Sequence, residues 1–220
     1  NDGAGEFDRI ASSIYEVGVS TVATESQILK MSQELAAAGN MAGFTANEVI
    51  GLSGALASLG VQPERARGSI ERSFNFITAA VDGGGEKLNT FAQVAGTSAD
   101  EFASAWRDRP QEAFMQLLQG MNSVTEQGGN FQQMLADLGM TGVRDLDVYR
   151  RLAANVEFVG QSMNISSDAW DNGERHVDAY GKVADNVASK LQTLASSALG
   201  ILDALNSSEG VGVVIDSLKL

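Results

Sequence analysis

Cysteine is absent from this chain of 220 residues, and histidine and proline are rare, with one and two copies. Without cysteine there can be no disulfide, no thiolate nucleophile and no cysteine-ligated metal site. The one histidine, His176, cannot build a histidine-rich metal site by itself. Two prolines leave room for long helices, because a proline inside a helix interrupts its hydrogen bonds. Aromatic residues make up only 6% of the chain, which favours helices packed through small side chains over a β-sandwich.

Positive charge is also scarce, with 15 Lys and Arg residues against 28 Asp and Glu residues and a net charge of −13. A chain this acidic repels phosphate backbones and anionic membrane surfaces, so we expect no direct nucleic-acid binding. No apolar run approaches the roughly 18 residues that a membrane span needs. The first residues, NDGAGEF, contain neither Met nor a basic stretch before an apolar one, so we expect a segment of a longer protein without a signal peptide.

The sequence does contain the start and stop signals of a helical protein. Capping boxes of the form S/T-x-x-E/Q mark helix starts at Thr24, Thr45 and Ser98. Glycines that follow apolar runs mark helix ends at Gly39, Gly60, Gly96 and Gly139. The prolines suit first helical positions, at Pro63 and Pro110. These signals predict an all-α fold, a multi-helix bundle of about nine helices with a long C-terminal amphipathic helix.

That last helix is predicted from about residue 167 to about residue 205, because its apolar positions recur at alternating steps of three and four. These recurring apolar positions form a seam along the helix. The seam predicts a partner or self-association face made of Val177, Tyr180, Val187, Leu191, Leu194, Ile201 and Leu205. A shorter helix before it carries on one face Leu146, Tyr149, Ala153, Val156 and Met163. We therefore divide the chain into a compact helical core region (1–165), the heptad-patterned helix (166–206), packed on the core or on a partner, and a Gly/apolar tail (207–220) that leads into further chain.

Four stretches have compositions that could serve binding or catalysis. The Gly83-Gly84-Gly85 run lacks the spacing of a phosphate-binding loop and has no strand before it, so it predicts a flexible loop between helices. The stretch from Asp168 has Trp170 and Ala179 at the third and twelfth positions, where a calcium loop requires oxygen ligands, so residues 168–173 fit a helix start instead. His176 is interpreted as solvated or partly packed. Pairing within one helix accounts for a mixed charged stretch made of Glu64, Arg65, Arg67, Glu71 and Arg72.

These negative results predict a chain that is not an enzyme, with no catalytic, cofactor-binding or metal-binding residue and no cofactor. Carboxylates are numerous, and spacing alone does not exclude an acid pair for glycoside hydrolysis. None of them, however, lies in aromatic, glycine-rich surroundings typical of such a cleft.

Residues 35–77 and 83–121 resemble the core of tail tape measure proteins of long-tailed bacteriophages and prophages. The similarity is carried by FAQVAGTSADEF at residues 91–102, by the Trp-Arg-x-x-Pro break at residues 106–110, and by Leu138-Gly139-Met140. It continues with Arg144 and a helix ending in Leu152-Ala153, and Trp170-Asp171-Asn172-Gly173 heads the last helix as it does in the family. In order and spacing, the resemblance covers roughly residues 10 to 200.

The resemblance implies a structural virion protein that sets tail length and leaves the particle with the genome. It implies a place in the tail lumen of the virion, and in the host cytoplasm during assembly. The implied partners are the tail tube protein, tail assembly chaperones and tail-tip or baseplate proteins, with self-association and with membrane contact only through other parts of the parent chain. Since glycine stops make helices fold back on one another, we expect a compact domain here and the extended rod elsewhere in that chain.

Two other functions stay open at the level of sequence. One is a peptidoglycan hydrolase segment of the same tail. The other is a secreted, membrane-active helical effector, which the acidic composition disfavours near neutral pH.

Overall fold

The structure is a computed structural model that describes the backbone of residues 2–180 and the side chains of residues 8–172. This part of the chain is all-helical and contains no strand, so the expected all-α, multi-helix fold is confirmed, with ten helices where about nine were expected. The helices are α1 Asp2–Ser20, α2 Glu25–Met41, α3 Ala46–Ser58, α4 Pro63–Gly83, α5 Gly85–Ala95, α6 Ala99–Asp108, α7 Pro110–Glu126, α8 Phe131–Asp137, α9 Val143–Ala154 and α10 Val156–Tyr180.

The expected helix starts are confirmed. Thr24, Thr45 and Ser98 precede α2, α3 and α6, and each N–H donates to the side chain three residues on, at 2.8 to 3.0 Å. Such a bond satisfies a backbone donor that the helix itself leaves unpaired. Pro63 and Pro110 occupy first-turn positions of α4 and α7, where a missing N–H costs nothing.

Three of the four expected helix ends are confirmed, since Gly60, Gly96 and Gly139 adopt φ of +71°, +73° and +86°. The fourth is wrong, because Gly39 lies inside α2 and the chain turns at Gly43, with φ +82°. Gly39 has a packing role instead. A Cβ atom there would lie 2.4 Å from Val49 Cγ2, so glycine lets α3 lie close to α2.

Two other boundaries differ from the sequence interpretation. The Gly83–Gly85 run is not a loop of several residues, because α4 reaches Gly83, α5 begins at Gly85, and Gly84 alone separates them. The last described helix begins at Val156 and not near residue 167, so the boundary at 165/166 and the expected start at 168–173 fall inside α10. The break comes at Asn155, whose φ of −124° and ψ of 32° are not helical.

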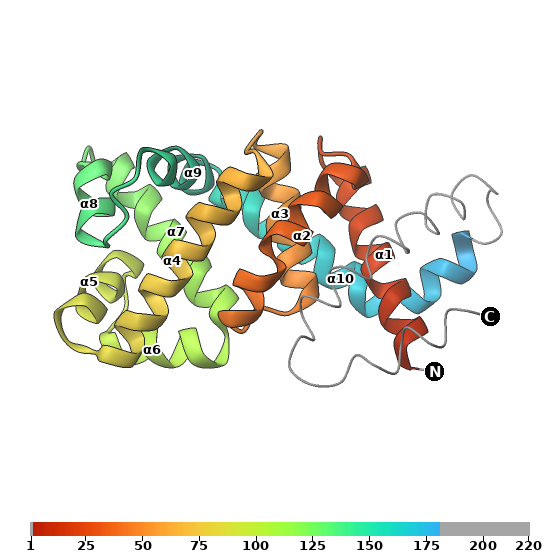
Figure 1. The fold of residues 1–220 in the computed structure, drawn as a ribbon, viewed down its shortest axis with the longest axis horizontal. Coiled ribbons are helices and arrows are strands. Elements are labelled where there is room, and N and C mark those ends of the chain that lie inside the picture. The colour runs from red at the N-terminus through yellow and green to blue at the C-terminus, as the bar shows by residue number, and fades with distance from the viewer. Residues whose placement is uncertain (1, 181–220) are drawn as a thin grey trace.

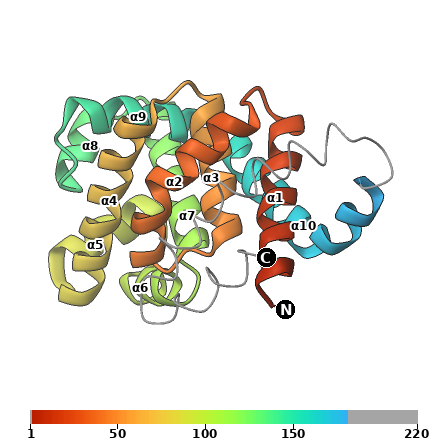
Figure 2. The ribbon, with the colours of Figure 1, turned by 45° about the vertical axis from the view of Figure 1, so that its right-hand side comes forward.

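Helices α1 and α10 lie at one end of the molecule and α5 and α8 at the other, with α2 and α3 between them (Figures 1 and 2). Helix α3 is the central element, and its residues 49–56 are all buried. Two of its glycines make room for neighbours: a Cβ on Gly51 would lie 2.5 Å from Met163 Cα of α10, and one on Gly54 would lie 2.2 Å from Val17 Cγ1 of α1. We call these three helices the α1–α3–α10 group.

Hydroxyl groups connect the same three helices. Ser162 Oγ donates to Gly51 O at 2.7 Å, Ser13 Oγ donates to Ser166 O at 2.9 Å, and Ser166 Oγ donates to Asn47 O at 2.7 Å. The apolar cluster around them is small and aliphatic, and its buried members are Ile10, Ile14, Val17, Ala23, Ile28, Leu29, Ala36 and Ile50. Close backbones and buried hydroxyls therefore hold this end together.

A larger apolar cluster fills the rest of the molecule and draws on α2 to α10. Its centre is a set of buried rings, in which Phe74 stacks on Phe44 with centroids 4.8 Å apart and meets Phe114 edge-to-face at 5.4 Å. Trp106 and Tyr149 extend the set at centroid distances of 5.5 Å from Phe74 and 6.5 Å from Phe114. We call these five rings the aromatic cluster.

Candidate functional site: a polar clamp on the α3–α4 hairpin

Helices α3 and α4 form a hairpin whose turn is closed by backbone hydrogen bonds. Gly60 N–H donates to Ala57 O and Val61 N–H donates to Leu56 O, both at 3.0 Å, which is the Schellman arrangement that ends a helix at a left-handed glycine. Helix α9 contacts this hairpin from the side. Four side chains of α9 bond to it, and they make up the most developed polar site among the described residues.

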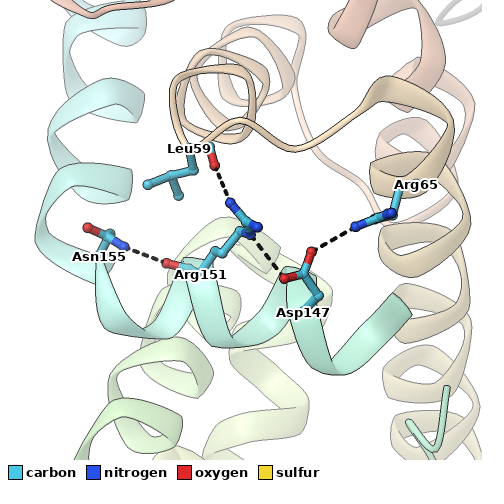
Figure 3. A network of polar contacts seen from close by, with 5 residues as sticks. All are labelled: Leu59, Arg65, Asp147, Arg151 and Asn155. Carbon is cyan, nitrogen blue, oxygen red and sulfur yellow. Dashed lines mark hydrogen bonds and ion pairs between the residues drawn. The ribbon is translucent and has the colours of Figure 1, made fainter. Parts of the chain in front are cut away.

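One end of α9 binds the turn of the hairpin (Figure 3). Arg151 Nη1 donates to Leu59 O at 2.9 Å, and its Nε donates to Asp147 Oδ1 at 3.2 Å. The second oxygen of Asp147 accepts from Arg65 Nη1 of α4 at 3.0 Å. Asn155 Nδ2 donates to Arg151 O at 2.9 Å, which satisfies a carbonyl at the end of α9. Partial burial raises the pKa of Asp147, but the two arginines outweigh it and hold that pKa below its ordinary value.

The next pair along the hairpin is more deeply buried on its acidic side. Arg72 of α4 donates from Nε to Asp145 Oδ2 at 3.3 Å and from Nη2 to Asp145 Oδ1 at 2.5 Å. The Asp145 side chain is 4% exposed and that of Arg72 is 47% exposed. This two-point bond to Asp145 raises the pKa of Arg72 and keeps its guanidinium charged. A carboxylate so far from water depends on this partner for its stability.

The third contact is a buried hydrogen bond between Tyr149 and Ser73. Ser73 Oγ donates its one proton to Ile70 O at 2.9 Å, so the Tyr149 hydroxyl is the donor to Ser73 Oγ. Burial raises the pKa of Tyr149 far above its ordinary value, and the hydroxyl stays protonated. The ring of Tyr149 belongs to the aromatic cluster, so this contact joins the polar site to the core. We call these four side chains the α9 clamp: Asp145, Asp147, Tyr149 and Arg151.

The expected pairing within α4 is wrong. Arg65 and Arg72 pair with α9, as described above. Arg67 Nη1 lies 3.2 Å from Glu34 Oε2, and Lys30 Nζ lies 3.5 Å from Glu64 Oε1, and both of these partners belong to α2. The charged stretch therefore ties α4 to a helix on each side. Sequence proximity gave the wrong partners because the true ones are as many as 82 residues away.

The sequence does not single out the clamp residues as a site. Its apolar spacing places Tyr149 only on an apolar face. The one signal that was available is the spacing of Asp147 and Arg151, four residues apart on a helix, which favours an ion pair. Chemically, the clamp holds helices: its carboxylates accept from arginines and its tyrosine donates to a serine.

The predicted self-association face lies mostly outside the described residues. Val177 and Tyr180 belong to α10, but their side chains are outside the described range, as is all of the seam at Val187, Leu191, Leu194, Ile201 and Leu205. Within the described residues, no three His, Asp or Glu side chains gather where they could hold a metal ion. None of the described helices combines the length and apolarity needed to cross a bilayer.

Comparison with known proteins adds no relative. No family model matches the chain, and searches among curated proteins and among solved structures found no match.

Proposed function

We propose that the chain is a segment of a structural virion protein, a phage tail tape measure protein that acts in tail assembly, tail-length determination and genome ejection. The proposal rests on the ordered motifs along residues 10 to 200. Its main structural support is that the motif residues join helices to one another.

The Trp-Arg-x-x-Pro break is the best example. Trp106 Nε1 donates to Thr78 Oγ1 at 3.1 Å, and Arg107 Nη2 donates to Val81 O at 3.0 Å. Both acceptors lie in α4, so the end of α6 is fixed to α4 just before Pro110 begins α7. Residues with these bonds serve the architecture of the domain.

The other motifs have comparable roles. Phe91 of α5 and Phe102 of α6 stack with centroids 6.2 Å apart, and Ser98 caps α6 between them. Gly139 ends α8, and Leu152 is fully buried on α9. A protein that must be built into a particle needs such well-defined joints, and this supports a structural role.

As a tape measure segment, the protein would occupy the tail lumen of the virion and be found in the host cytoplasm during assembly. Its partners would be the tail tube protein, tail assembly chaperones and tail-tip or baseplate proteins. The described residues form back-folded helices, so we assign this segment to docking at a tail end or to chaperones and the rod to other parts of the parent chain.

Mass spectrometry of purified particles tests the proposal. Particles are induced from the strain that encodes the chain, banded by density, and separated into head and tail fractions. We expect tryptic peptides of the α3–α4 hairpin in the tail fraction and not in the head fraction. Their absence from particles would refute the proposal, as would clearing of cell-wall material in a gel by the purified chain.

A further inference from the structure

Besides the clamp, the described surface has a shallow hollow beside the start of α9, with a volume of about 480 Å³. It lies between α4 and the connection from α8 to α9. We call it the Phe76–Val143 hollow. The side chains that matter for its chemistry are Arg72, Phe76, Val143, Arg144 and Asp145.

Two apolar side chains are exposed in this hollow. Val143 is 84% exposed and Phe76 is 38% exposed, and among the five exposed large apolar side chains of the described residues these two line one depression. The Phe76 ring rests on the backbone of Gly139, which leaves 3.7 Å between the ring and a Cβ built there. The ring therefore lies beside this glycine and stays partly exposed to water.

The hollow also carries positive charge in a chain whose net charge is −13. Arg144 is exposed and pairs with no carboxylate among the described residues. Arg72 is paired with buried Asp145 but keeps nearly half of its side chain exposed. Two guanidinium groups and one buried carboxylate leave a local excess of one positive charge at the rim.

We propose that the Phe76–Val143 hollow docks a peptide segment of another protein that presents an aliphatic side chain beside one or two carboxylates. The aliphatic side chain covers Phe76 and Val143, and a carboxylate pairs with Arg144. Apolar anchoring next to an ion pair is a common basis of protein recognition. A strongly acidic partner fits less well, because the chain as a whole repels it.

Nucleic acid is the weaker occupant for the same hollow. One unpaired cation neutralises about one phosphate, and the acidic remainder of the chain opposes a polyanion. A phosphate also makes no favourable contact with the apolar side chains of Phe76 and Val143. The docking surface does not require the proposed function, because its test uses only the isolated chain and a synthetic peptide.

Docking is also coupled to the clamp, since Arg72 lines the hollow and pairs with Asp145 of the clamp. A partner that covers Arg72 reduces its contact with water while Asp145 holds its guanidinium in place. Binding to the folded chain alone stabilises it by mass action. We therefore expect the melting temperature to rise when the peptide is added.

The test measures fluorescence anisotropy of a labelled helical peptide of about 12 residues, with Leu on one face and two Glu beside it, against the 220-residue chain. We expect saturable binding with a Kd on the order of 10 to 100 μM, as for a small interface. Val143→Asp should weaken binding by about 10-fold. The matched control is Val22→Asp, because Val22 is also 84% exposed but lies on the α1–α2 connection. It should leave the affinity unchanged.

A second pair of variants tests the charge. Arg144→Glu should weaken binding by about 5-fold or more, whereas Lys87→Glu, an equal change at another exposed position, should have no effect. Circular dichroism checks that each variant folds. The proposal is overturned if no saturable binding occurs, or if a peptide with Gln in place of Glu binds with equal affinity. It is also overturned if Val143→Asp and Val22→Asp weaken binding equally, or if a short single-stranded DNA binds more tightly than the peptide. If Val143→Asp converts an oligomer of the chain without peptide into a monomer, as measured by its mass in solution, the hollow binds a second copy of the chain. That result would also overturn the proposal.

Discussion

Two regions of the molecule are held together in different ways. In the α1–α3–α10 group, α3 lies so close to its neighbours that Gly51 has no room for a Cβ, and buried serine hydroxyls bond to backbone carbonyls across the helices. The aromatic cluster and the α9 clamp instead fill their space with large rings and join helices by long charged side chains. The first arrangement is sensitive to added volume, and the second to lost volume or lost charge.

The largest effect is expected in the aromatic cluster. Phe114→Ala should lower the free energy of unfolding by about 4 kcal/mol, because a fully buried ring that contacts three others leaves a cavity. Phe76→Ala is the control on the same type of residue, and since Phe76 is 38% exposed the loss should stay below about 1.5 kcal/mol. Urea denaturation measures both. Similar losses for the two variants would mean that the cluster is not tightly packed.

The next effect concerns the clamp. Arg72→Leu leaves the Asp145 carboxylate buried without its partner and should cost about 3 kcal/mol. Arg65→Leu removes the same kind of residue from the same helix, but its partner Asp147 is 35% exposed, so we expect less than about 1 kcal/mol. Urea denaturation near neutral pH distinguishes them. Equal costs would contradict the assignment of Asp145 as the buried anchor of the clamp.

A smaller effect, of the opposite kind, is expected in the α1–α3–α10 group. Gly51→Ala adds one methyl group 2.5 Å from Met163 Cα and 3.0 Å from Ser162 O, and backbone atoms cannot move aside cheaply. We expect a loss of about 2 kcal/mol. Gly83→Ala is the matched control, since nothing lies within 4 Å of its Cβ position, and it should be neutral or stabilising by up to about 1 kcal/mol. Unchanged stability of Gly51→Ala would contradict this difference between the two regions.

The smallest effect depends on pH. Tyr149 has a folded-state pKa raised above the ordinary 10.0, so above that pH the unfolded chain releases a proton that the folded chain retains. The stability that this tyrosine supports is therefore intact below about pH 10 and falls as the pH rises further. Tyr149→Phe should cost about 1 kcal/mol at neutral pH through the lost bond to Ser73. It should also make the alkaline decline shallower, which thermal melts from pH 8 to 11 would reveal; an unchanged slope would contradict the role of this hydroxyl.

Local signals in the sequence predicted local structure well. Capping boxes and left-handed glycines act within four residues, so Thr24, Thr45, Ser98 and Gly60 were placed correctly. The prediction of a helix end at Gly39 is wrong because a glycine after an apolar run has two explanations, a helix end or a close approach of another helix. Only the packing of Val49 against Gly39 decides between them.

Features that depend on the packing of distant parts of the chain were not predicted. The break at Asn155 has neither glycine nor proline to mark it, and the apolar spacing continues across it. The sequence therefore places Leu146 to Met163 on one helix, whereas the structure divides them between α9 and α10. The contacts between the clamp and the hairpin join residues that are 73 to 92 positions apart in the sequence. Arg65 and Arg72 each have a nearer carboxylate in the sequence that suggests a different partner. Which carboxylate is buried follows only from the packing of α9 on the hairpin.

We propose that these helices are part of a phage tail. Electron microscopy of particles tests it most directly, with cells in which the coding region for the 220 residues is deleted in frame and with a plasmid copy as the control. We expect tails of the normal uniform length to disappear and to return with the plasmid. Tails of unchanged number and length in the deletion strain would contradict the claim.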